Sequence, residues 1–178
     1  MAEFYYEAQD LAVRLGSRNP YALLDYICAV LRIVYEFDQN GLKGFVTIMN
    51  DVSYVVINGN LPELEKKIVA GHEAAHLVLH KKEILLSGAG TFKDFGLYDN
   101  SGKMEFEANS FLSDFLVSDE QVMEIILSTN TDFYSAAKQL ELPPPLFSFK
   151  LYSMTRRGFK FKNPAPLKSG FLGGDYIW

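Results

Sequence analysis

Residues 72–76 have the sequence His-Glu-Ala-Ala-His, an HExxH motif, in a segment whose apolar residues recur at helical spacing. About one helical turn separates the histidines, so their imidazoles lie on one face, about 6 Å apart along the helix axis. Two imidazoles at this spacing can bind one zinc ion, and the glutamate can accept a proton from a water molecule at the open metal position. The motif therefore predicts His72 and His76 as metal ligands and Glu73 as a general base.

Zinc at a catalytic site usually has three protein ligands. The chain has only three histidines, and the third, His80, lies on the same face of the predicted helix as the other two. It is about 12 Å along the axis from His72, too far for both to bind one ion. We therefore expect His80 to support a ligand, to cap the helix or to lie at the surface.

A carboxylate on the helix predicted for residues 103–117 is the expected third ligand. Glu105 and Glu107 flank the apolar face of this helix on opposite sides, and periodicity does not choose between them. Asp114 lies on the Glu107 edge two turns further on, where a carboxylate could orient a metal ligand. The alternative for each acid is a solvated helix flank, the commoner position of such residues.

Three short β-rich segments precede the motif helix and predict a small antiparallel or mixed sheet. The expected strands span residues 32–37, 44–49 and 53–57. The expected helices span residues 4–15, 20–31, 62–81, 103–117, 119–127, 132–140 and 143–155. Asn19 followed by Pro20 is typical of a helix start. The fold class is therefore α+β, mostly helical, with a three-stranded sheet before the HExxH helix.

Composition limits the classes of partner. The net charge of −5 does not favour direct nucleic-acid binding. No segment is apolar for long enough to span a membrane, and the amino terminus lacks the features of a signal peptide. The single cysteine, Cys28, lies in an apolar run where we expect it to be buried, and one cysteine permits no intramolecular disulfide. These features predict a cytoplasmic protein.

Two further segments have open roles. Residues 86–102 are rich in Gly, Asp, Asn and Ser, and are expected either to line a substrate cleft or to form a surface loop. Tyr98 in this segment is a candidate oxyanion donor, with a surface aromatic as the alternative. Residues 158–178 combine basic and aromatic side chains, so we separate them as a tail from a domain at residues 1–157. The tail either recognises a partner through charge and aromatic contacts or covers the core of the domain.

Three blocks of the sequence resemble the ImmA/IrrE family of zinc metallopeptidases. Residues 57–80 resemble its strand and HExxH block, including the trailing histidine, and residues 105–118 resemble its E-x-E-A-N-x-F block. Residues 136–157 resemble its carboxyl-terminal helical region. The resemblance covers most of the chain from residue 19 to about residue 159. The chain departs from the family pattern at Ala74-Ala75, at Leu112-Ser113 and at Val117-Ser118.

The resemblance implies a zincin-like domain of gluzincin type in which Glu107, immediately before Ala-Asn, is the third zinc ligand. It also maps Asp114 onto an acidic position of the family. The implied activity is a cytoplasmic zinc-dependent endopeptidase of bacterial or phage origin. The implied substrate is a helix-turn-helix transcriptional repressor of a prophage or mobile element, whose cleavage would lift repression.

Two other classes of function remain open. A zinc-containing binding protein could sequester a repressor without cutting it. A DNA-associated regulator of stress responses is suggested by the basic tail, although the acidic balance of the whole chain does not favour it.

Overall fold

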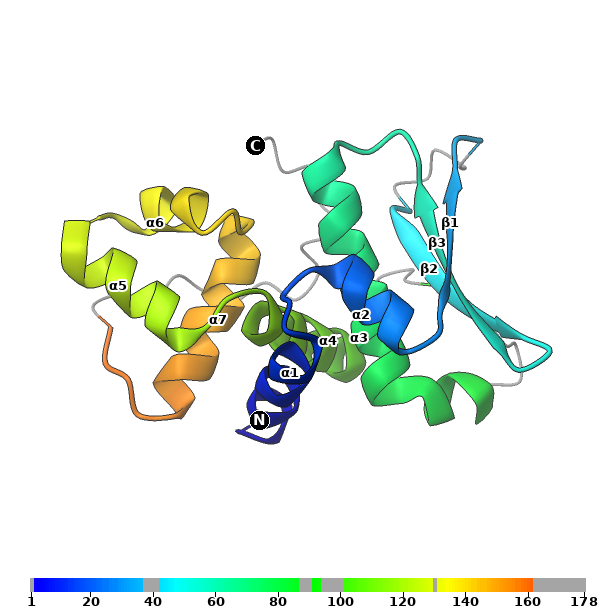
Figure 1. Ribbon diagram of the computed structural model, residues 1–178, viewed down its shortest axis with the longest axis horizontal. Coiled ribbons are helices and arrows are strands. Elements are labelled where there is room, and N and C mark those ends of the chain that lie inside the picture. Colours follow the sequence, from blue (N-terminus) through cyan, green and yellow to red (C-terminus); the bar gives the residue numbers. More distant parts are fainter. Residues whose placement is uncertain (1, 37–41, 87–90, 94–100, 130, 162–178) are drawn as a thin grey trace.

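The fold places helices on one face of a four-stranded sheet (Figure 1). The computed structural model describes residues 2–36, 42–86, 91–93, 101–129 and 131–161. The helices are α1 (Ala2–Leu15), α2 (Pro20–Tyr26), α3 (Glu63–Leu86), α4 (Ser101–Leu116), α5 (Asp119–Thr129), α6 (Phe133–Gln139) and α7 (Pro144–Arg156). The strands are β1 (Val30–Val34), β2 (Gly44–Met49), β3 (Val52–Asn58) and β4 (Thr91–Lys93).

The sheet has the order β1-β3-β2-β4. β2 pairs antiparallel with both β3 and β4, whereas β1 runs parallel to β3. Asn50 and Asp51 join β2 to β3 with φ values of 50° and 62°, the left-handed geometry that tight hairpins require. The three strands predicted from the sequence are thus confirmed. β4 is an additional strand inside a segment that we expected to be a loop.

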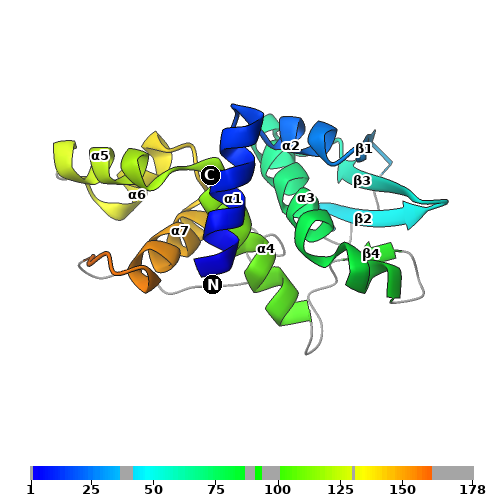
Figure 2. The ribbon, with the colours of Figure 1, turned by 60° about the horizontal axis from the view of Figure 1, so that its bottom comes forward.

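α3 occupies the centre of the molecule. It packs against β2 and β3 on one side and against α2 and α4 on the other, while α1 and α7 pack on α4 (Figure 2). The HExxH segment and its neighbours, from Ile68 to Leu77, are consequently buried. The α+β class with a small sheet before this helix is confirmed. α5, α6 and α7 form a helical group on the side of α4 away from the sheet (Figure 1).

The predicted helix start at α2 is confirmed, because Asn19 Oδ1 accepts a hydrogen bond from the amide of Tyr21 at 3.1 Å. A reciprocal pair starts α5. The amide of Gln121 donates to Ser118 Oγ, and the amide of Ser118 donates to Gln121 Oε1. This is a capping box, which satisfies two amides at the helix start.

The expectation for Cys28 is wrong. α2 ends at Tyr26, and Cys28 lies beyond it, exposed, with φ of 54°. The chain turns here so that the apolar residues that follow can enter β1 rather than extend the helix. The amide of Ala29 closes this turn on the carbonyl of Leu24 at 3.0 Å.

The beginning of the basic tail packs against the core. Phe159 and Phe161 are partly buried there, and their rings stack with centroids 6.4 Å apart. These contacts favour a covering role for the first tail residues, while residues 162–178 lie outside the described residues. The division at residue 157 stays a prediction. Among the helices that the structure describes, none has the length and apolar character that crossing a bilayer requires.

Candidate metal centre

Three buried side chains converge where α3 packs against α4. They are His72 and His76 from the HExxH motif and Glu105 from α4. Glu105 Oε2 lies 3.0 Å from His72 Nε2, and Glu105 Oε1 lies 3.0 Å from His76 Nε2. The two Nε2 atoms are also 3.0 Å apart. One nitrogen or oxygen atom from each residue therefore faces a common point.

Asn109 determines which nitrogen of His72 is available to a cation. Its Oδ1 lies 3.0 Å from His72 Nδ1 and acts as the acceptor, so the ring proton is on Nδ1 and the Nε2 lone pair faces the other two residues. Bonds of about 2.0–2.1 Å in a tetrahedral zinc site imply ligand atoms roughly 3.3 Å apart. The observed 3.0 Å separations are close to this value. The donor set fits a zinc ion.

The ionisation of this group also suits a cation. Burial lowers the pKa of His76 to about 4, so the imidazole is neutral at pH 7. Burial alone would raise the pKa of Glu105, but the adjacent His72 and His76 imidazoles outweigh burial and hold the pKa of that carboxyl below its usual range. A neutral imidazole and an ionised carboxylate are the forms that bind metal.

The structure corrects the assignment of Glu107 as the third ligand. Its carboxylate lies 3.7 Å from His80 Nε2 and is not part of the converging group, where Glu105 stands instead. Glu105 shares its helix face with Asn109 and Leu112, four and seven residues on, and this face lies against α3. The four-residue spacing places Glu105 and Asn109 on one helix face, but only the packing of α4 on α3 brings that face to the two histidines.

Asp114, expected near the metal ligands, instead joins α4 to α7. Lys150 Nζ donates to its Oδ1 at 2.9 Å, and Ser153 Oγ donates to its Oδ2 at 2.5 Å. Burial raises the pKa of Asp114, against the opposing effect of the Lys150 ammonium. The same ammonium lies 2.9 Å from Asp119, which is also paired with Arg157. Asp114 thus belongs to a buried ionic network between helices.

Glu73 is buried on the side of α3 that packs against the start of β2. A Cβ atom added at Gly44 would lie 3.4 Å from Glu73 Oε1, so the carboxylate is close to the backbone of the first residue of β2. Glu73 follows His72 directly but is not one of the three converging groups. Tyr98, the other candidate for the chemistry, lies outside the described residues.

His80 lies one turn beyond His76, where the backbone leaves helical geometry with φ of −126° and ψ of 16°. Its side chain is buried, and its ring centroid is 5.6 Å from that of His76. It is not a member of the converging group, in line with the separation predicted for a helix.

Comparison with known proteins identifies the family. The model of the IrrE N-terminal-like domain, peptidase family M78, matches residues 31–152, a range that includes α3, α4 and all three converging side chains. The chain belongs to the ImmA/IrrE family. A relative, the "uncharacterized immunity region protein 2" of Bacillus phage phi105, is 30% identical over 125 residues, which is 70% of this chain and 73% of the phage protein. Family membership assigns the chain to the metallopeptidases.

Close packing behind the metal centre makes Gly71 sensitive to substitution in this ImmA/IrrE protein. An added Cβ would lie 2.5 Å from Leu112 Cδ1 and 3.1 Å from Pro20 Cγ. We expect Gly71→Ala to lower the free energy of unfolding by about 1–3 kcal/mol, because the buried leucine and the proline ring must move. Chemical denaturation measures this effect.

Gly102→Ala is the matched control, since a Cβ there meets nothing within 4 Å. We expect it to leave stability unchanged or slightly raised, because alanine favours a helix. Equal stability of the two variants would contradict the close packing inferred at Gly71.

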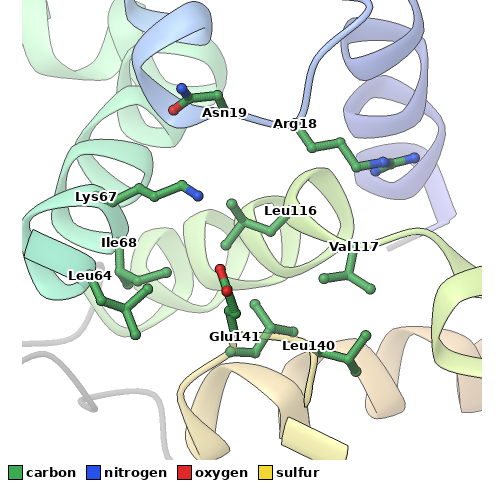
Figure 3. Close-up of a pocket in the computed structure, with 10 residues that line it drawn as sticks. Arg18, Asn19, Leu64, Lys67, Ile68, Leu116, Val117, Leu140 and Glu141 are labelled. Carbon is green, nitrogen blue, oxygen red and sulfur yellow. The ribbon is translucent and has the colours of Figure 1, made fainter. Parts of the chain in front are cut away.

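A separate pocket of about 250 Å³ lies between the amino-terminal part of α3, the end of α4 and the connection from α6 to α7. Figure 3 shows the side chains of Lys67 and Glu141 directed into it, whereas the guanidinium of Arg18 points away. Arg18 donates instead to the carbonyl of Phe115 at 2.8 Å. None of the three converging residues lines this pocket, so it is not part of the metal centre.

Proposed function

We propose that this protein is a zinc-dependent endopeptidase. The observation that carries the proposal is the buried convergence of His72, His76 and Glu105, with their facing atoms 3.0 Å apart. Two imidazoles from HExxH and one carboxylate from another helix are a ligand set of catalytic zinc sites that leaves one position open. Membership in a metallopeptidase family supports the same activity.

Zinc bound at these residues would polarise the scissile carbonyl and lower the pKa of a water molecule. Glu73 accepts the proton of the attacking water and passes it to the leaving amine. The burial of Glu73 near the first residue of β2 keeps its carboxylate away from bulk solvent. Asn109 holds the His72 ring in the orientation and tautomer that the site needs.

The proposed substrate is a helix-turn-helix transcriptional repressor. Two lines support it: the resemblance of the sequence to ImmA/IrrE peptidases, and the name of the phage relative, which refers to an immunity region. A repressor substrate places the reaction in the cytoplasm. Cleavage of this substrate would relieve repression of a prophage or mobile element.

Metal analysis of two variants tests the ligand set. Glu105→Ala is expected to lose stoichiometric zinc, because it removes one of three ligand atoms, whereas Glu107→Ala should keep one zinc per chain. The two residues belong to the same turns of α4, so each variant controls for the other. Loss of zinc from Glu107→Ala alone would restore the ligand set that the family resemblance implied, and a wild-type protein without zinc would overturn the proposed function.

A further inference from the structure

α3 and α4 contact each other in antiparallel order along the ligand-bearing face. The successive contacts toward the carboxyl end of α3 are Gly71 with Leu112, His72 with Asn109, and His76 with Glu105. The next residue of α3 on this face is His80, one turn further on. It therefore meets the first turns of α4, immediately before the proposed ligand Glu105.

The contact at this position is a hydrogen bond between the two helices. Burial lowers the pKa of His80, and a hydrogen bond with the backbone of Met104 raises it. A bond that favours the protonated ring is one in which the ring N–H donates to the carbonyl. Nε2 is buried without a hydrogen-bond partner, which leaves Nδ1 as the donor. Met104 directly precedes Glu105, so this bond acts on the backbone that carries the ligand.

We infer that His80 is a positioning residue that holds Glu105 at the metal centre by donating a hydrogen bond from Nδ1 to the carbonyl of Met104. The inference rests on the proposed zinc function. The departure from helical geometry begins at His80, so the helical turn between His72 and His76 is undisturbed. α4 begins at Ser101, so Glu105 lies only about one turn from the amino-terminal end of its helix. A fixed carbonyl there restrains a turn that would otherwise fray.

Glu107 does not provide this restraint. Its Oε2 is 3.7 Å from His80 Nε2, longer than a hydrogen bond, and its other oxygen is 3.7 Å from the exposed Lys103. The two nitrogens of His80 therefore have different roles. Nδ1 donates to the α4 backbone, while Nε2 faces the Glu107 carboxylate at 3.7 Å, beyond hydrogen-bond distance. Substitutions that preserve one nitrogen position and not the other can separate these roles.

The test compares three substitutions at His80 in the full chain. The amide nitrogen of His80→Asn occupies the place of Nδ1, and that of His80→Gln occupies the place of Nε2. His80→Leu retains an apolar side chain with no donor. We expect His80→Leu and His80→Gln to weaken zinc binding by about ten- to a hundredfold, as loss of a group that supports a ligand does. His80→Asn should bind zinc almost as tightly as the wild type.

Zinc affinity is measured by competition with a chelator, and the absorption spectrum of the Co²⁺-substituted protein reports whether Glu105 still coordinates. Thermal unfolding of the zinc-free proteins is the second measurement. A purely structural role would lower the unfolding temperature without changing the Co²⁺ spectrum of the folded protein. A positioning role changes the spectrum of His80→Leu and leaves that of His80→Asn unchanged.

Several results would overturn the inference. These are wild-type affinity in His80→Leu, equal weakness of His80→Asn and His80→Leu, or an unchanged Co²⁺ spectrum in His80→Leu. If His80→Leu fails to fold, the comparison of His80→Asn with His80→Gln decides. Glu105→Ala distinguishes a failure of the proposed zinc function from a failure of the proposed role of His80. Loss of zinc in Glu105→Ala with normal binding in His80→Leu rejects only the role of His80, whereas a wild type that binds no zinc rejects both.

Discussion

Glu73→Gln is expected to reduce cleavage of the proposed repressor substrate by about 10²–10⁴-fold, the usual contribution of a general base. The amide has nearly the shape of the carboxylate, so the buried position between α3 and β2 should remain filled. Because Glu73 is not one of the three converging groups, zinc content should stay at one per chain. Single-turnover cleavage assays, metal analysis and circular dichroism measure the three quantities.

Glu63→Gln is the matched control on the same helix. Its side chain is 84% exposed and lies at the first turn of α3, so activity should not change. Full activity in Glu73→Gln would reject the proposed base. A wild-type protein that binds the repressor and leaves it intact would instead establish sequestration without cleavage.

Asp114→Ala is expected to lower the free energy of unfolding by about 3–5 kcal/mol, the usual cost of removing one partner from a buried ion pair. The Lys150 side chain is fully buried and would lose one of its two carboxylate partners. The hydroxyl of Ser153 would lose its acceptor as well. Denaturation of the zinc-free protein measures the effect without a contribution from metal binding.

Two further variants serve as controls for the Asp114→Ala measurement. Asp10→Ala removes a carboxylate from an exposed pair with Arg14, and we expect little change because solvent screens such pairs. The double variant Asp114→Leu with Lys150→Met replaces the buried pair by apolar side chains and should recover much of the loss. If Asp114→Ala cost no more than Asp10→Ala, the network would not hold α4 against α7.

The strongest predictions from the sequence were local ones. The HExxH spacing placed two imidazoles on one helix face, since helical geometry is the same in every context. Cap residues at α2 and α5 satisfied amides within a few positions of themselves, so neighbouring sequence was enough to locate those helix starts. The end of α2 was predicted too late, because the apolar run around Cys28 belongs first to a helix and then to strand β1. The position of the change from helix to strand depends on how β1 pairs in the sheet, which the local sequence does not contain.

The sequence by itself determined how His72, Glu73 and His76 lie relative to one another, because that relation depends on one helical turn. The choice between Glu105 and Glu107 was decided by tertiary structure. Two residues along a helix differ by about 200° in direction, so the rotation of α4 selects which carboxylate faces α3. That rotation is set by packing on both sides of α4. Leu112 lies against the glycine of α3, and Phe106 lies against Phe149 and Tyr152 of α7. These contacts join segments far apart in the chain, so no local pattern contains them.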